Sequence, residues 1–258
     1  MKITKIEKKK RLYLLEIDKN DKLYVTEDTI VHFMLSKGME INETRLKDIQ
    51  KFAQFSYGKN LALYYLSFKQ RTAAEVQKYL EQHDIDSLYI PEILEKLKKE
   101  NWINDEQYID TYLSQNLNTG DKGAYVLKQN LIQKGIDSQL INQKFSHLNF
   151  SVLSEKVAQK LLRKYQHKCS TKTLKDKIIQ NMIIKGFSYS EAKSAFESLE
   201  IEKDNKQEFE LLYKELDKQY QKYSKKYDGY NLKQRLTQSL ARKGFNFEDI
   251  ASALRDYF

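Results

Sequence analysis

The chain has 258 residues, 31% of them charged, and a formal net charge of +9. Its single cysteine excludes an internal disulfide. One proline and eight glycines disfavour β-sandwiches and glycine-rich nucleotide folds. No apolar run is long enough to span a bilayer, and no signal-peptide core follows the charged start, so we expect a cytoplasmic protein without membrane contact.

The first 57 residues predict a small mixed module. The stretch 12–25 is rich in β-forming residues around a polar turn, which predicts a β-hairpin. A helix is expected after Thr26, ending near Gly38, and a second one over residues 43–56.

From residue 60 onward the sequence is helical in pattern, and one short phrase recurs four times. It consists of a large aliphatic residue, two spacers, a basic residue, usually glycine, and then Ile or Phe. The copies are Leu80–Ile85, Leu131–Ile136, Met182–Phe187 and Leu240–Phe245, at steps of 51, 51 and 58 residues. A fixed period of this size is typical of stacked helical repeats.

The phrase also predicts how one helix of each repeat ends. Gly135, Gly186 and Gly244 follow a lysine at the end of a helix, where glycine closes the last turn in the left-handed conformation. Asp84 holds this place in the first copy. At the start of the same helix in the first repeat, Thr72 and Glu75 have the spacing of a capping box.

We therefore predict a mainly α fold, in which tandem three-helix repeats form an elongated, curved solenoid behind an N-terminal module with a β-hairpin and helices. The expected divisions are 1–57 for that module, then 58–103, 104–149, 150–200 and 201–258 for repeats one to four.

Catalytic chemistry is not indicated. The sequence lacks a phosphate-binding loop, its four histidines are scattered, and no Cys/His cluster has zinc spacing. The acidic pair Asp105–Glu106 suits the start of a helix. We expect no enzyme activity, no cofactor and no metal.

Charge is distributed unevenly between the repeats. Residues 61–120 carry six basic and ten acidic side chains, a net −4, whereas residues 151–187 carry nine basic and two acidic ones, a net +7. Cations spaced along helices of the third repeat suit a phosphate backbone, and a predominance of lysine favours charge contact over reading of bases. A solvated lysine face is the alternative. The candidate DNA- or filament-binding residues are Lys156, Lys160, Arg163, Lys172 and Lys175, with Lys168 on the same face as the last two if their helix starts early.

Three segments resemble the RecX family, which regulates the RecA recombinase. They are 66–80, Trp102–Tyr108 with its acidic pair between aromatic residues, and Gly123–Ile136; the rest of the repeats match by their pattern. Asn104 and Asn130 depart from the acidic residues usual in the family. The resemblance implies tandem three-helix repeats and a non-enzymatic protein that binds the RecA–DNA filament and restrains its ATPase and strand exchange.

Three other functions are compatible with the residues. The first is a non-specific nucleic-acid-binding repeat protein without a recombinase partner. The second is an enzyme in the N-terminal module, and the third is a protein scaffold that does not contact DNA. A monomer is expected, because the charge pattern is asymmetric.

Overall fold

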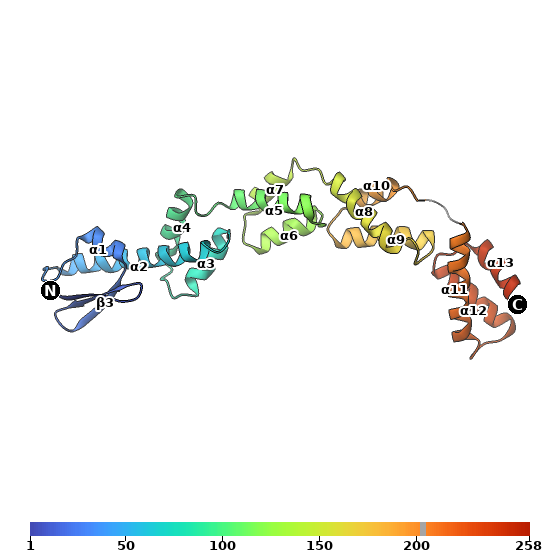
Figure 1. Ribbon diagram of the computed structural model, residues 1–258, viewed down its shortest axis with the longest axis horizontal. Helices are drawn as coiled ribbons and strands as arrows, with labels where there is room; N and C mark the ends of the chain where they lie inside the picture. The colour runs from blue at the N-terminus through green and yellow to red at the C-terminus, as the bar shows by residue number, and fades with distance from the viewer. Residues whose placement is uncertain (202–204) are drawn as a thin grey trace. The chain divides into compact units, whose positions relative to one another are not determined.

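The chain folds into two compact units in the computed structural model (Figure 1), which describes residues 1–201 and 205–258. Unit 1 comprises residues 1–112 and 130–144, and unit 2 comprises residues 113–129 and 145–258.

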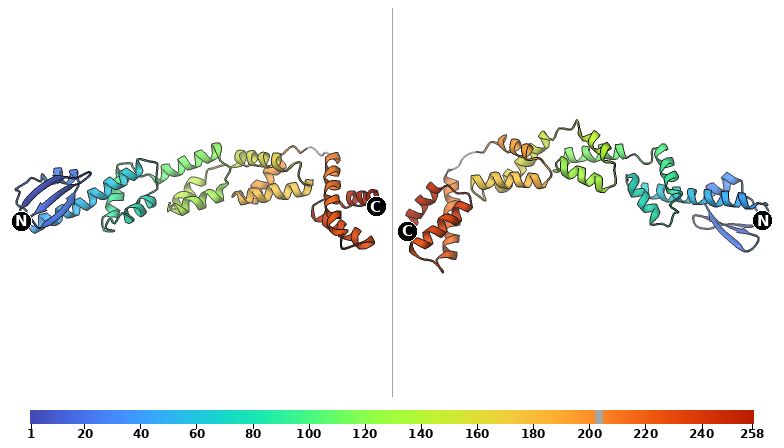
Figure 2. Two further views of the ribbon diagram at one scale, coloured as in Figure 1. Left: turned by 60° about the horizontal axis from the view of Figure 1, so that its bottom comes forward. Right: turned by 180° about the vertical axis from the view of Figure 1, so that it is seen from behind.

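The N-terminal sheet has three antiparallel strands in the order β1-β2-β3. They are β1 (Ile3–Lys8), β2 (Tyr13–Ile17) and β3 (Asp21–Val25). The predicted hairpin corresponds to β2 and β3, whereas β1 was not predicted. Leu15, Ile17 and Val25 of the sheet are buried in one core with residues that follow the strands. Figure 2 shows the strands beside the helices that follow them.

Two helices follow the sheet. Helix α1 (Glu27–Phe33) begins at Thr26, whose hydroxyl accepts the N–H of Thr29. It ends at Met34, which is left-handed, so the helix is shorter than the predicted end near Gly38.

Helix α2 (Glu43–Leu66) is one continuous helix of 24 residues, so the helix predicted over residues 43–56 continues beyond its expected end. Gly58 is buried in its middle, where a Cβ would lie 2.6 Å from Ile93 Cδ1. The glycine therefore permits close packing on the helix carrying Ile93 and does not interrupt α2.

The remaining helices fall into the predicted groups of three. They are α3 (Ala73–Glu81), α4 (Ile90–Lys99), α5 (Asp105–Thr119), α6 (Ala124–Gln133), α7 (Ser138–Phe145), α8 (Ser151–Tyr165), α9 (Thr171–Ile184), α10 (Tyr189–Glu197), α11 (Asn205–Tyr223), α12 (Gly229–Arg242) and α13 (Phe247–Tyr257). Helices α2, α3 and α4 pack together, as do α8, α9 and α10, and α11, α12 and α13. The polar segment 200–206, which the sequence favours as a flexible joint before the fourth repeat, includes residues 202–204, which lie outside the described residues.

The first and last groups each have their own apolar core. In the first, Val76, Leu80 and Ile93 are completely buried, and in the last, Leu216, Leu236 and Ile250 are. The spacing of Tyr213, Tyr220 and Tyr223 along α11 favours core positions, but these side chains are only partly buried and pack against the last core. The first and last groups therefore resemble small helical domains.

The recurring phrase forms the contact between successive repeats. In unit 1, the carbonyl of Lys134 at the end of α6 accepts a 2.8 Å hydrogen bond from Thr72 Oγ1, which caps the start of α3. In unit 2, the carbonyl of Lys185 after α9 accepts the N–H of Gly123 at 2.8 Å, directly before α6.

The third contact repeats this arrangement in unit 2. The carbonyl of Lys243 after α12 accepts 2.7 Å hydrogen bonds from Ser170 Oγ and Thr173 Oγ1 at the start of α9. The second helix of a three-helix repeat is its middle helix, here α3, α6, α9 and α12. At each contact the end of one middle helix thus meets the start of the middle helix of the preceding repeat. Carbonyls at a helix end lack hydrogen-bond donors within their own helix, and here the preceding repeat supplies these donors. The partial charges of the two helix ends are also opposite in sign.

Ion pairs accompany two of these contacts. Lys134 Nζ lies 2.8 Å from Glu75 Oε1, and Glu75 also accepts the N–H of Thr72, which confirms the predicted capping box. Lys185 pairs with Asp121. In the third contact Lys243 instead pairs with Glu215 of its own repeat, at 3.4 Å.

The glycine of the phrase is needed for close approach as well as for the turn. Gly135, Gly186 and Gly244 have φ of +76°, +95° and +83°, as predicted. A Cβ on Gly135 would lie 2.3 Å from Ala74 Cβ, and one on Gly186 would lie 2.6 Å from Val126 N. Asp84 has the same left-handed backbone but is exposed, so a side chain is tolerated there.

We predict that Gly135→Ala destabilises unit 1 more than Gly38→Ala does. Both glycines are left-handed, but at Gly38 the nearest atom to a Cβ lies 4.0 Å away. The control, Gly38→Ala, should lower the free energy of unfolding by about 1 kcal/mol because of the backbone conformation alone. Gly135→Ala should lower it by about 1 to 3 kcal/mol more, because the new Cβ overlaps Ala74. Denaturant unfolding measures both changes, and equal losses would contradict a tight contact between the repeats.

The contact between the second and third repeats, where Lys185 pairs with Asp121, should weaken in acid. The pKa of the Asp121 carboxyl lies below its ordinary value of 3.8, because Lys185 donates a hydrogen bond to it. The stabilisation is therefore present above about pH 4 and is lost as the pH falls through the lower, folded-state pKa. Thermal unfolding between pH 5 and pH 2 should show a smaller acid-induced loss for Asp121→Asn than for the unchanged chain. Parallel curves would show that the pair contributes nothing.

Candidate nucleic-acid interface

The predicted basic residues of α8 share one exposed face. Lys156, Lys160 and Arg163 are exposed, while Leu153 and Val157 are buried against the neighbouring helices. This is the helical spacing expected from the sequence.

The same three cations line a shallow depression together with Glu155, Gln159 and the residues after α10, Ser198 and Leu199. None of them forms an ion pair with a carboxylate among the described residues. Three cations with one carboxylate, Glu155, among the lining residues give a surface of positive potential.

The two candidates on α9 are arranged differently. Helix α9 begins at Thr171 after its cap Ser170, so Lys168 lies before the helix and not on the predicted face with Lys172. Lys175 is half-buried, with Nζ 5.8 Å from the centre of the Phe196 ring. Lys172 is exposed, but neither it nor Lys175 lines the depression beside α8.

A second basic concavity was not predicted from the sequence. It lies between the third and fourth repeats, and its charged lining consists of Lys168, Lys177, Lys214, Lys218, Lys243 and Glu215, with His167 beside them. The one carboxylate among these residues is already paired with Lys243. Part of this concavity could have been found in the sequence, because Lys214 and Lys218 lie four residues apart on the side of α11 opposite its buried leucines. Only the fold brings these two lysines close to Lys168 and Lys177.

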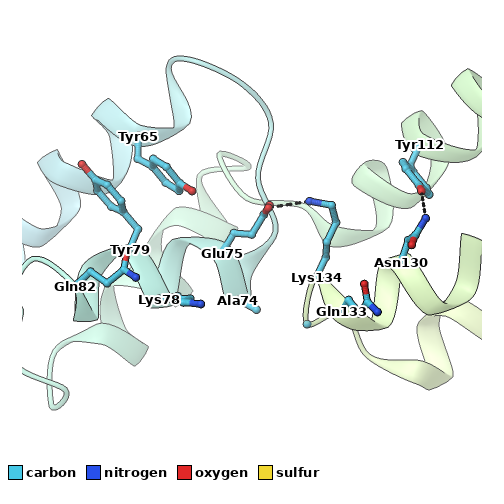
Figure 3. A pocket seen from close by; sticks show the side chains of 11 residues that line it. Tyr65, Ala74, Glu75, Lys78, Tyr79, Gln82, Tyr112, Asn130, Gln133 and Lys134 are labelled. Atoms are coloured by element: carbon cyan, nitrogen blue, oxygen red, sulfur yellow. Dashed lines mark hydrogen bonds and ion pairs between the residues drawn. The ribbon is translucent and has the colours of Figure 1, made fainter.

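A groove of different character lies in unit 1 at the contact between the first two repeats (Figure 3). The rings of Tyr65 and Tyr79 stack in parallel with centres 4.0 Å apart, and the Arg71 guanidinium lies 4.2 Å from the Tyr65 centre. Across the groove, Asn130 donates a 2.9 Å hydrogen bond to Tyr112 Oη (Figure 3). The neutral amide that departs from the family pattern therefore has a partner here.

The groups considered for catalysis have structural roles. Asp105 Oδ1 accepts the N–H of Ala73 at the start of α3, and Glu106 pairs with Lys144. Burial raises the pKa of the Cys169 thiol, which keeps it protonated. In the described part of the chain no three His, Cys, Asp or Glu residues are grouped to hold a metal ion. No helix in that part combines the length and the hydropathy that crossing a membrane would require.

Comparison with known proteins identifies the family. Three family models match in chain order: the first three-helix domain of RecX over residues 59–97, the second over 104–144 and the third over 206–254. Helices α8 to α10, which carry the basic face, lie between the second and third matched segments.

Curated relatives match over their whole length. The protein named Regulatory protein RecX from Streptococcus sanguinis strain SK36 is 66% identical over 257 residues, and the one from Streptococcus gordonii is 64% identical over 258, each covering 100% of both chains.

Two solved structures are similar. A crystal structure of regulatory protein RecX has a TM-score of 0.61 and 31% identity, covering 76% of this chain and 97% of its own. RecX from Lactobacillus salivarius has a TM-score of 0.53 and 36% identity, covering 57% of this chain and 96% of its own. Since the domain models match in order and the relatives match from end to end, the chain belongs to the RecX family of regulatory proteins.

Proposed function

We propose that this chain acts in the cytoplasm as a non-enzymatic regulator that binds the RecA–DNA filament and inhibits its ATPase and strand exchange. Membership of the RecX family supports the regulatory role. The single structural observation behind a filament contact is the unpaired basic face formed by Lys156, Lys160 and Arg163. We assign this face to DNA phosphates or to an acidic surface of the filament.

Repeated contacts suit a filament as a target. Successive repeats present different charges, net −4 over residues 61–120 and net +7 over residues 151–187. A filament offers its protein and its DNA at regular intervals, so modest contacts made by several repeats of one chain add through their high effective concentration. Lys172 adds a separate exposed cation on α9, whereas half-buried Lys175 contributes less.

The alternative is a non-specific nucleic-acid-binding protein without a recombinase partner. The observation that favours it is the same excess of lysine, because charge contact to phosphate needs no partner protein. A competition titration separates the two functions. Preference for RecA-coated single strands over naked strands supports the filament regulator, and equal binding supports the alternative.

Charge reversal on α8 should relieve inhibition. In an assay of RecA ATPase on single-stranded DNA, the variant with Lys156→Glu, Lys160→Glu and Arg163→Glu should need roughly tenfold more protein for half-inhibition at low salt, because three phosphate or carboxylate contacts are lost. Its inhibition should also depend less on salt concentration than that of the unchanged chain.

The matched control carries Lys47→Glu, Lys51→Glu and Lys98→Glu, three exposed lysines of unit 1 that give the same change in net charge. It should inhibit like the unchanged chain. If the α8 variant inhibits normally at every salt concentration, the basic face is not the filament contact; if the unchanged chain does not affect the ATPase at all, the proposed function is wrong.

A further inference from the structure

The N-terminal module carries a second cationic surface, separate from the one assigned to the filament. Four consecutive basic residues, Lys8 to Arg11, stand at the end of β1 and in the turn that follows it, and all of them are exposed. Lys9 pairs with Glu7 at 2.6 Å, whereas Lys10 and Arg11 have no carboxylate partner among the described residues. Two cations at the tip of the sheet are therefore available to an anion.

Aromatic rings adjoin these free cations. Tyr24 on β3 is 56% exposed and lines a shallow depression with Lys9, Lys10 and Arg11. The Arg11 guanidinium lies 5.0 Å from the centre of the Tyr64 ring on α2, so this arginine connects the sheet to the helix.

The rings continue along α2. Tyr57, Tyr64 and Phe68 follow one another at 0, +7 and +11, a spacing that keeps one side of a helix, and they are 37%, 47% and 66% exposed. Phe68 lies just beyond the last residue of α2 and makes an edge contact with Tyr64, with ring centres 5.0 Å apart. At 1.5 Å per residue the three rings cover about 16 Å along the helix.

We propose that Lys10, Arg11, Tyr24, Tyr64 and Phe68 form a binding surface for single-stranded nucleic acid that works without a recombinase. Free cations next to exposed rings are the combination that single strands require, because the backbone needs positive charge and unpaired bases stack on aromatic faces. A duplex conceals the faces of its bases and gains only the charge contact. An acidic protein surface would use the cations but leave most of the ring area without a stacking partner.

The test is fluorescence anisotropy of the full chain with a labelled oligothymidine, in the absence of RecA. Lys156→Glu, Lys160→Glu and Arg163→Glu are present throughout, so that the face on α8 does not dominate the signal. This background should still bind the single strand. Loss of all binding in it would contradict the proposal, whereas the proposed function concerns a different face and would stand.

Two sets of substitutions are then added separately. Tyr64→Ala with Phe68→Ala should weaken binding at least about tenfold while leaving its salt dependence unchanged, since stacking is lost and charge is kept. Lys10→Glu with Arg11→Glu should weaken binding and also reduce the slope of log affinity against log salt by about 1.4, which corresponds to two phosphate contacts on a single strand. All four side chains are exposed or at a turn, and circular dichroism verifies folding.

The control is Lys47→Glu with Lys51→Glu on the same helix, about 20 Å or more along its axis from Tyr64, and it should bind like the background. Cross-linking of a bromouracil-containing strand should modify Tyr24, Tyr64 or Phe68. Unchanged affinity in both sets would overturn the proposal. So would tighter binding of a duplex or of an acidic peptide than of the single strand.

Discussion

The hydrogen bond between the end of one middle helix and the start of the one before it organises the repeats of this protein. At each of three contacts, the carbonyl of a lysine accepts from a donor at the preceding helix start: Thr72 Oγ1, Gly123 N, or Ser170 Oγ with Thr173 Oγ1. The groups that join are those that helix geometry leaves without partners. Each repeat thus completes the hydrogen bonding of its neighbour.

This constraint explains the sequence phrase. A lysine followed by glycine would close a helix in an isolated domain, but the closest atoms to the glycine positions belong to the preceding repeat, such as Ala74 beside Gly135 and Val126 beside Gly186. The first copy supports this explanation, because His83 and Asp84 are exposed and the glycine is absent. The contact also bears on function, since the concavity with Lys168 and Lys177 receives Lys214 and Lys218 from the next repeat.

Periodic features of the fold could be predicted, and features that depend on contacts distant in sequence could not. The capping box at Thr72 and the left-handed glycines follow from spacing alone, and both were confirmed. The helix predicted over residues 43–56 continues to Leu66, because Gly58 within it permits the close approach of Ile93, some 35 residues away.

The same distinction applies to the candidate site. Exposure of Lys156, Lys160 and Arg163 follows from a helical pattern that also buries their neighbours. The contact of Lys175 with Phe196 and the basic concavity involving α11 depend on how helices pack, which a charge pattern does not encode. Our proposal that the basic face binds DNA or the RecA filament rests on membership of the family and on charge.

Hydrogen exchange at the start of α6 tests the contact between repeats most directly. The N–H groups of Gly123 and Tyr125 precede or begin a helix, where amides ordinarily exchange fast, yet here they donate to the carbonyls of Lys185 and Gly186. Native-state exchange should find both strongly protected relative to Val152 in the exposed first turn of α8. Exchange of all three at the same fast rate would contradict the end-to-end joining of the helices.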